Sequence, residues 1–105
     1  AVISMFNIVN HILTISDLED YFFGISKNLK KDGTFVFDCF NQLAVIKDRP
    51  AVKSTKKIKM IPFFNPFKSE MIFEYCGELE YTLRHKIWSP NILIEIMNCF
   101  DITPI

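Results

Sequence analysis

Two short runs near the start of the chain are mainly apolar: Ala1–Phe6, broken only by Ser4, and Thr34–Phe40, apolar until Asp38. Such runs suit strands that are covered on both faces, as in parallel sheets. Between the runs, Leu18, Phe22, Ile25 and Leu29 follow one another at spacings of four, three and four. This spacing places them on one face of a helix. Residues 1–41 therefore predict two adjacent parallel strands joined by a right-handed crossover helix, the unit of a doubly wound α/β sheet.

The ends of this helix carry their own signals. Ser16 and Glu19 have the spacing of a capping box, so Ser16 is the expected N-cap. Asp32-Gly33 is expected to end the helix, with Gly33 in the positive-φ conformation. The preceding segment, Asn7–Ile15, is expected to be a loop or short turn, because Asn and Thr side chains compete with the backbone for hydrogen bonds.

The pattern changes in the second half of the chain. Gln42–Arg49 is a candidate short helix, and a turn is expected in Pro62–Pro66. Apolar and polar residues then alternate with a period of two through Met71–Ile87, which is typical of half-buried antiparallel strands. Residues 50–88 thus predict an antiparallel meander inserted after the parallel unit.

Residues 89–105 predict a helix and a final strand. Ser89 is a candidate N-cap with Pro90 at the first helical position. An apolar stripe follows at helical spacing: Ile92, Leu93, Ile96, Met97 and Phe100. Asp101–Ile105 is expected to start an extended strand. We therefore expect one α/β domain over residues 1–105, a partial doubly wound, Rossmann-like sheet with an inserted antiparallel β-meander.

Composition limits the function classes. Half of the 105 residues are hydrophobic and eleven are Phe, so an aromatic core is expected. Zero formal net charge argues against a nucleic-acid binder, and no apolar run reaches the roughly 18 residues of a membrane span. The cysteines, Cys39, Cys76 and Cys99, fit neither a disulfide framework nor a metal site, so reduced thiols and a cytoplasmic location are expected.

Two segments are similar to one enzyme family. The first forty-one residues, with LKKDGTFVFD at Leu29–Asp38, resemble the fourth strand, following helix and fifth strand of class I S-adenosylmethionine-dependent methyltransferases. YTLRHKIWSPNILIEIMNCFDITPI, at Tyr81–Ile105, resembles the H-x-x-W-T-P helix entry near the end of small-molecule members. Together they cover about two thirds of the chain. The inserted strands fit the subgroup that methylates amino sugars and related metabolites.

The resemblance implies S-adenosylmethionine as cofactor. Ser4, Met5 and Phe6 would then line its methionine end, although simple strand packing explains them equally well. The family holds the cofactor with a Gly-rich loop and an acidic residue in its first half, and the three glycines of this chain lie in no such setting. We therefore expect the C-terminal part of a methyltransferase fold, with the first half elsewhere.

Candidate substrate groups lie at the carboxyl ends of the two strands, where doubly wound sheets bind ligands. His11, within the family-like string S-M-F-x-x-x-x-H, is the candidate catalytic base, because histidine titrates near neutral pH. A loop histidine bonded to backbone carbonyls is the alternative. Asn7, Asn10 and Asn41 are candidate substrate contacts, although asparagine is also a common turn residue.

Three further features allow two interpretations each. His85 is a candidate substrate contact, but a partly buried structural role on its apolar strand face is favoured. Asp38 either contacts substrate or caps nearby backbone amides, with capping favoured. The lysines within Lys53–Lys59 either attract an acidic acceptor or solvate an exposed strand edge, and the second is favoured.

The leading function is S-adenosylmethionine-dependent methyl transfer to a small-molecule acceptor, within a longer protein. The alternative is a non-catalytic fragment or assembly module that pairs its open sheet edge with a second copy, as a homodimer, or with the missing N-terminal half. Neither nucleic acid nor membrane is an expected partner.

Overall fold

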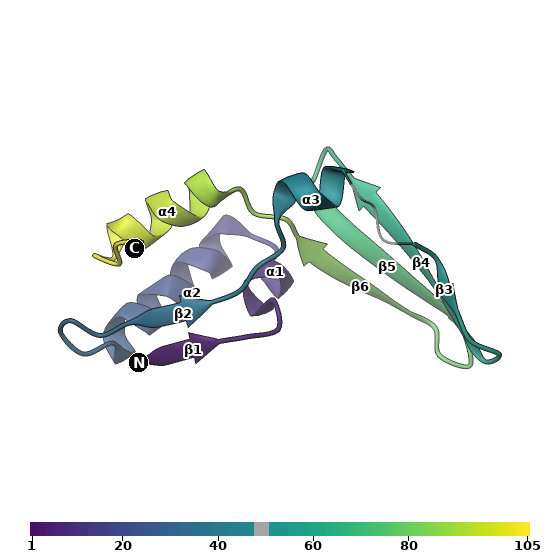
Figure 1. Cartoon of the computed structure of the whole chain (residues 1–105), viewed down its shortest axis with the longest axis horizontal. Helices are drawn as coiled ribbons and strands as arrows, with labels where there is room; N and C mark the ends of the chain where they lie inside the picture. Colours follow the sequence, from purple (N-terminus) through teal and green to yellow (C-terminus); the bar gives the residue numbers. More distant parts are fainter. Residues whose placement is uncertain (48–50) are drawn as a thin grey trace.

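The computed structural model describes residues 1–47 and 51–105. Its elements are β1 (Val2–Ser4), α1 (Ile8–His11), α2 (Ile15–Asn28), β2 (Phe35–Phe37), α3 (Gln42–Lys47), β3 (Lys53–Ser54), β4 (Ile58–Asn65), β5 (Glu70–Gly77), β6 (Tyr81–Lys86) and α4 (Pro90–Cys99). The molecule is elongated, 51 × 25 × 22 Å. Figure 1 shows the parallel pair and the antiparallel sheet at opposite ends, with α4 beside α2. The mixed α/β fold class is confirmed.

The predicted parallel pair is present. β1 and β2 run in the same direction with Val2 opposite Phe35 and Ser4 opposite Phe37, and α2 forms the crossover between them. Phe35 and Phe37 pack edge-on against the fully buried Phe22 of α2, at ring-centroid distances of 6.3 and 6.1 Å. The buried face of α2 predicted from the spacing of its apolar residues is therefore confirmed.

The start of α2 differs from the capping-box prediction. Thr14, not Ser16, is the N-cap, and its hydroxyl accepts the N–H of Asp17 at 3.2 Å. The Leu18 N–H already donates to the Thr14 carbonyl, so helical bonding begins before Ser16 can cap it. The segment before the helix contains a one-turn helix, α1, held in place by burial of Val9.

Gly33 does not take the predicted positive φ. Asp32 does, at 61°, and aspartate tolerates this region better than most residues. Gly33 is needed for space instead, because a Cβ there would lie 2.8 Å from the Lys30 carbonyl oxygen. The turn after α2 thus depends on a close backbone approach.

Two glycine-to-alanine substitutions should have opposite effects on stability. Gly24 lies inside α2, and a methyl group added there would have no neighbouring atom within 4 Å, so Gly24→Ala is expected to raise the free energy of unfolding by about 0.5–1 kcal/mol. Gly33→Ala is expected to lower it by roughly 1–3 kcal/mol because of the steric clash. Urea unfolding of both variants measures this, and equal effects would contradict the packing described for Gly33.

The antiparallel sheet has the order β3-β4-β5-β6 and confirms the predicted meander. Pro62 lies inside β4 rather than in a turn, contrary to expectation. β3 pairs only with Lys59 and Met60, so the edge of β4 beside Pro62 is open within the described residues, and proline is tolerated at such an edge. The turn follows Asn65, whose side-chain oxygen accepts the N–H groups of Phe67 and Lys68.

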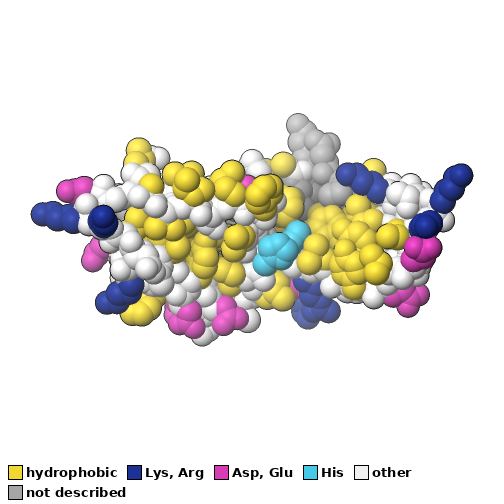
Figure 2. Space-filling view, turned by 90° about the horizontal axis from the view of Figure 1, so that it is seen from below, with side chains coloured by type: hydrophobic (Ala, Val, Ile, Leu, Met, Phe, Trp, Pro, Cys, Tyr) yellow, Lys and Arg dark blue, Asp and Glu magenta, His cyan; other side chains and the backbone are white. Residues whose placement is uncertain are grey.

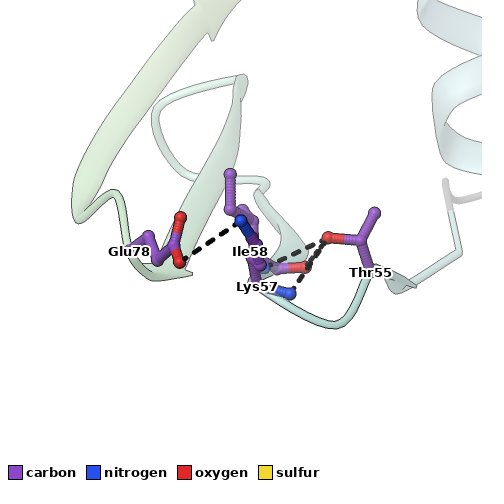
Figure 3. Close-up of polar contacts among 4 residues, drawn as sticks. All are labelled: Thr55, Lys57, Ile58 and Glu78. Carbon is purple, nitrogen blue, oxygen red and sulfur yellow. Dashed lines mark hydrogen bonds and ion pairs between the residues drawn. The ribbon is translucent and has the colours of Figure 1, made fainter.

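The lysine-rich strand edge lies at the hairpin ends far from α1 (Figure 1). Figure 3 shows Lys57 reaching toward Glu78, with a closest N–O distance of 3.9 Å. Both side chains are largely exposed, so this ion pair contributes little stability. The Thr55 hydroxyl accepts the Ile58 N–H at 3.2 Å and orders the adjacent turn. These contacts agree with the solvated-edge interpretation.

Among the residues that the structure describes, two hydrophobic clusters support the fold. The larger lies between α1, α2 and α4 and consists of Val9, Leu18, Phe22, Trp88, Leu93, Ile96 and Met97, with Phe35 and Phe37 packed against it. The smaller joins the antiparallel sheet to the segment after β2 and consists of Phe64, Met71 and Ile87, with Phe40 and Phe73 beside it. The boundary between the two clusters is where α1 meets β6.

The end of the chain is only partly as predicted. Ser89 caps α4 by accepting the Ile92 N–H at 3.3 Å, which confirms the predicted N-cap. Asp101–Ile105 forms no strand. Asp101 takes a positive φ of 59° and the Ile102 N–H returns to the Met97 carbonyl, so these residues terminate α4 instead. The predicted helix over Gln42–Arg49 is α3, and its last two predicted residues lie outside the described ones.

None of the helices in residues 1–47 and 51–105 combines the length and apolar character that crossing a membrane requires.

Candidate functional site

The backbone bends sharply where β1 ends. Phe6 and Asn7 have φ values of 65° and 57°, a conformation that is uncommon for a bulky residue. The Asp38 carboxylate, just beyond β2, holds this bend by accepting the N–H groups of Phe6 at 3.2 Å and Asn7 at 2.8 Å. Asp38 thus caps backbone amides, as favoured above. Backbone strain of this kind concentrates at functional sites.

Asn10 joins three segments beside this bend. Its side-chain nitrogen donates to the Lys86 carbonyl at 2.7 Å, and its side-chain oxygen accepts the Phe40 N–H at 2.9 Å. The residue has 0% of its surface exposed. Asn10 was expected to contact substrate, but the structure gives it no exposed surface and makes it a clamp that joins α1, β6 and the segment after β2.

Two histidines that are far apart in the sequence meet at this joint. The Nε2 atoms of His11, at the end of α1, and His85, on β6, lie 3.2 Å apart. Their rings are nearly perpendicular, with centroids 4.4 Å apart. His11 is exposed, whereas His85 retains only 7% exposure. One imidazole therefore faces solvent while its partner is held inside the protein.

Aromatic side chains surround the buried member of this pair. Phe40 and Phe73 lie 5.2 and 5.5 Å from the His85 ring, and Met71 is its cross-strand neighbour. No acidic side chain bonds to either ring in the part of the chain that the structure describes. Figure 2 shows histidine at the surface between two hydrophobic areas, one over the parallel unit and one over the antiparallel sheet. A small molecule that contacted this surface would meet a polar imidazole with apolar side chains on either side.

Burial lowers the pKa of His85 below its ordinary value of 6.5, and the neighbouring His11 lowers it further. The direction follows from the cost of placing a positive charge among apolar side chains and next to a second imidazole. His85 is therefore uncharged at neutral pH.

This depressed pKa makes stability depend on pH. Between the folded and unfolded pKa values of His85, the unfolded chain binds more protons, so the free energy of unfolding should fall as the pH falls below about 6.5. His85→Phe should remove this component. Urea unfolding of both proteins at about pH 7.5 and about pH 5.5 measures it. The same pH dependence in both would contradict the assignment.

The other predicted residues have different surroundings. Ser4 is buried and its hydroxyl accepts the Tyr21 O–H at 2.7 Å, so it faces α2. Met5 and Phe6 are 46% and 86% exposed at the end of β1. The Asn41 side chain accepts the N–H groups of Leu43 and Ala44 and caps α3. Asn7 lies in the bend, and its side chain makes no capping bond.

The structure thus brings His11, His85 and Asn10 together, with Asn7 nearby in sequence, but directs Ser4 and Asn41 elsewhere. Sequence reasoning missed the pairing of the histidines and the role of Trp88. The Trp88 indole N–H donates to the Val9 and Ile12 carbonyls at 3.1 Å and fixes α1 against the end of β6. The only signal for such a contact is a buried tryptophan, which needs a partner for its N–H.

No group of three or more histidine, cysteine or acidic side chains with metal-binding geometry occurs among residues 1–47 and 51–105.

Comparison with known proteins gives one structural likeness. No protein-family model matches the chain, and no curated protein does. The fold matches a solved S-adenosylmethionine-dependent methyltransferase from Clostridium acetobutylicum ATCC 824 with a TM-score of 0.71 and 15% sequence identity. The match covers 93% of this chain and 45% of that one. The chain therefore has the fold of part of a methyltransferase and spans less than half the length of the protein it matches.

Proposed function

We propose that this chain takes part in S-adenosylmethionine-dependent methyl transfer to a small-molecule acceptor, as one part of a longer protein. The likeness of the fold supports the reaction class. The observation that carries the proposal is the pair of exposed His11 and buried His85 just beyond the carboxyl end of β1, the edge at which doubly wound sheets bind ligands.

The histidine pair has the chemistry that an acceptor needs. S-adenosylmethionine, when bound, supplies an electrophilic methyl group. An amine or hydroxyl must present a lone pair to it and give up a proton, which a nearby imidazole can take. His11 is exposed to a ligand, and its partner His85 is uncharged at neutral pH because of its lowered pKa. Phe40 and Phe73 keep water away from the inner side of the pair.

The cofactor residues fit only in part. Ser4 does not, because its hydroxyl is bonded to Tyr21 and its surface is covered. Met5 and Phe6 do, because their side chains are exposed where β1 ends. Gly24 lies inside α2, Gly33 in the turn after α2 and Gly77 at the end of β5, and none of them adjoins this bend in the sequence. Cofactor binding by the chain thus rests on Met5 and Phe6, with additional contacts supplied from outside it.

His11→Ala should separate turnover from cofactor binding. In a protein that includes the rest of the fold, we expect turnover to fall by roughly 10²–10⁴-fold, as for loss of a general base, with little change in the S-adenosylmethionine dissociation constant measured by calorimetry. Asn28→Ala, which changes an exposed side chain at the far end of α2, is the control and should keep its turnover. Equal loss of turnover and affinity, or no loss, would contradict the role of His11.

A specific observation also favours the alternative of an assembly module. Ile3 and Val36 lie opposite each other on the face of the parallel sheet that the helices leave open, and they are 67% and 49% exposed. Within the described residues, each of β1 and β2 has one unpaired edge, which invites strand pairing. Calorimetry with S-adenosylmethionine on the 105-residue chain, beside sedimentation velocity, distinguishes the two: a one-site binding curve favours the enzyme, and silence up to millimolar ligand with self-association favours the module.

A further inference from the structure

The buried ring of His85 has one nitrogen without a partner. Nδ1 has no hydrogen bond and almost no exposed surface, whereas Nε2 lies 3.2 Å from His11 Nε2. A neutral imidazole carries one proton, on either nitrogen. The position of that proton in His85 therefore decides whether the Nε2 of His11 accepts or donates the hydrogen bond between the two rings.

Burial favours one arrangement of the protons. Were the proton on Nδ1 of His85, an N–H donor would be buried without an acceptor, and such orphaned donors are rare. With the proton on Nε2, the unpartnered Nδ1 is only an unused lone pair, and the N–H points to His11. The Nε2 atom of His11 must then accept this hydrogen bond, so the proton of neutral His11 lies on its Nδ1.

We propose that His85 is a positioning residue for His11: its Nε2–H fixes the ring orientation of His11 and holds it in the Nδ1–H tautomer. The Nδ1 of His11 is thus a hydrogen-bond donor in the resting protein, and its basic nitrogen is the Nε2 that it shares with His85. The inference deepens the proposed function, on which the catalytic meaning of the tautomer rests. For His11 to act as the base, its Nε2 must leave the hydrogen bond from His85 and take the acceptor's proton, which makes His11 an imidazolium.

Nuclear magnetic resonance of the whole chain with ¹⁵N-labelled histidine tests the proposal, because long-range proton–nitrogen spectra distinguish protonated from bare ring nitrogens. In the neutral form of both rings we expect a protonated Nδ1 and bare Nε2 in His11, and the reverse in His85. In His85→Phe, His11 should lose this preference and shift toward the Nε2–H tautomer. An Nε2–H tautomer of His11 in the unmodified chain, or an unchanged His11 in His85→Phe, would overturn the proposal.

Two further variants distinguish loss of the His85 N–H donor from a change in the packing around it. His85→Gln places an amide N–H at similar reach and should restore the Nδ1–H tautomer of His11; failure to restore it in a folded chain would also count against the proposal. Met71→Leu alters the packing opposite His85 without touching the donor, and should leave the tautomer unchanged. The spectra need neither cofactor nor acceptor. They therefore test the tautomer of His11 separately from methyl transfer, and either proposal can be overturned without the other.

Discussion

Asn10→Ala is expected to lower the free energy of unfolding by roughly 3 kcal/mol. The substitution removes the side-chain partner of the half-buried Lys86 carbonyl and Phe40 N–H, and each such group costs about 1–3 kcal/mol when it is left unpaired and shielded from water. The loss should be large because the two bonds connect the parallel unit to the antiparallel sheet. Urea unfolding followed by circular dichroism measures it.

Asn10→Asp is the informative companion variant. Its carboxylate still accepts the Phe40 N–H, but its second oxygen faces the Lys86 carbonyl in place of a donor. That repulsion raises the expected pKa of the new carboxyl, and the protonated form can donate to the carbonyl. Relative to the unmodified chain, Asn10→Asp should therefore be less destabilised near pH 4 than near pH 7. If the loss in the free energy of unfolding of Asn10→Asp were the same at both pH values, this would argue against the clamp.

Phe22→Ala is expected to lower the free energy of unfolding by about 3–5 kcal/mol. Phe22 has no exposed surface and its ring meets those of Tyr21, Phe35 and Phe37. Removing it opens a cavity where α2 crosses the parallel sheet, and the surrounding rings can fill that cavity only in part. Urea unfolding on a Gly24→Ala background, where greater stability is expected, keeps the variant measurable.

The neighbouring residue provides a matched control. Phe23 is 47% exposed, and its ring lies beside Phe100 and the Lys27 ammonium. Phe23→Ala removes the same atoms from the same helix but should cost less than about 1 kcal/mol. Similar losses in both variants would mean that α2 does not bury the face described for it.

Much of the fold could be predicted because the signals are local. The apolar runs around Val2–Ser4 and Phe35–Phe37 gave the parallel pair, and the spacing of Leu18 and Phe22 gave the buried face of α2. Period-two alternation gave β5 and β6. One error lies at a helix boundary, where Thr14 and Ser16 are competing N-caps. Another lies at Pro62, which is tolerated inside a strand because β3 does not pair with β4 at that position.

The candidate site could be predicted only as single residues. His11 was identified from its position after β1, and His85 from its place on an apolar strand face. The contact between the two histidines could not be predicted, because it depends on how β6 packs against α1 in the folded chain. Likewise, Asn10 appears in the sequence as an ordinary turn residue, and its two partners lie 76 and 30 residues away.

The sequence by itself determined the parallel pair, strands β5 and β6 and the buried face of α2, because burial periodicity and chain handedness act over a few neighbouring residues. Tertiary structure alone decided which polar groups meet at the joint between the two sheets. There the buried Asn10, Trp88 and His85 each had to find partners from distant segments, since a polar group hidden from water is stable only when it is hydrogen-bonded.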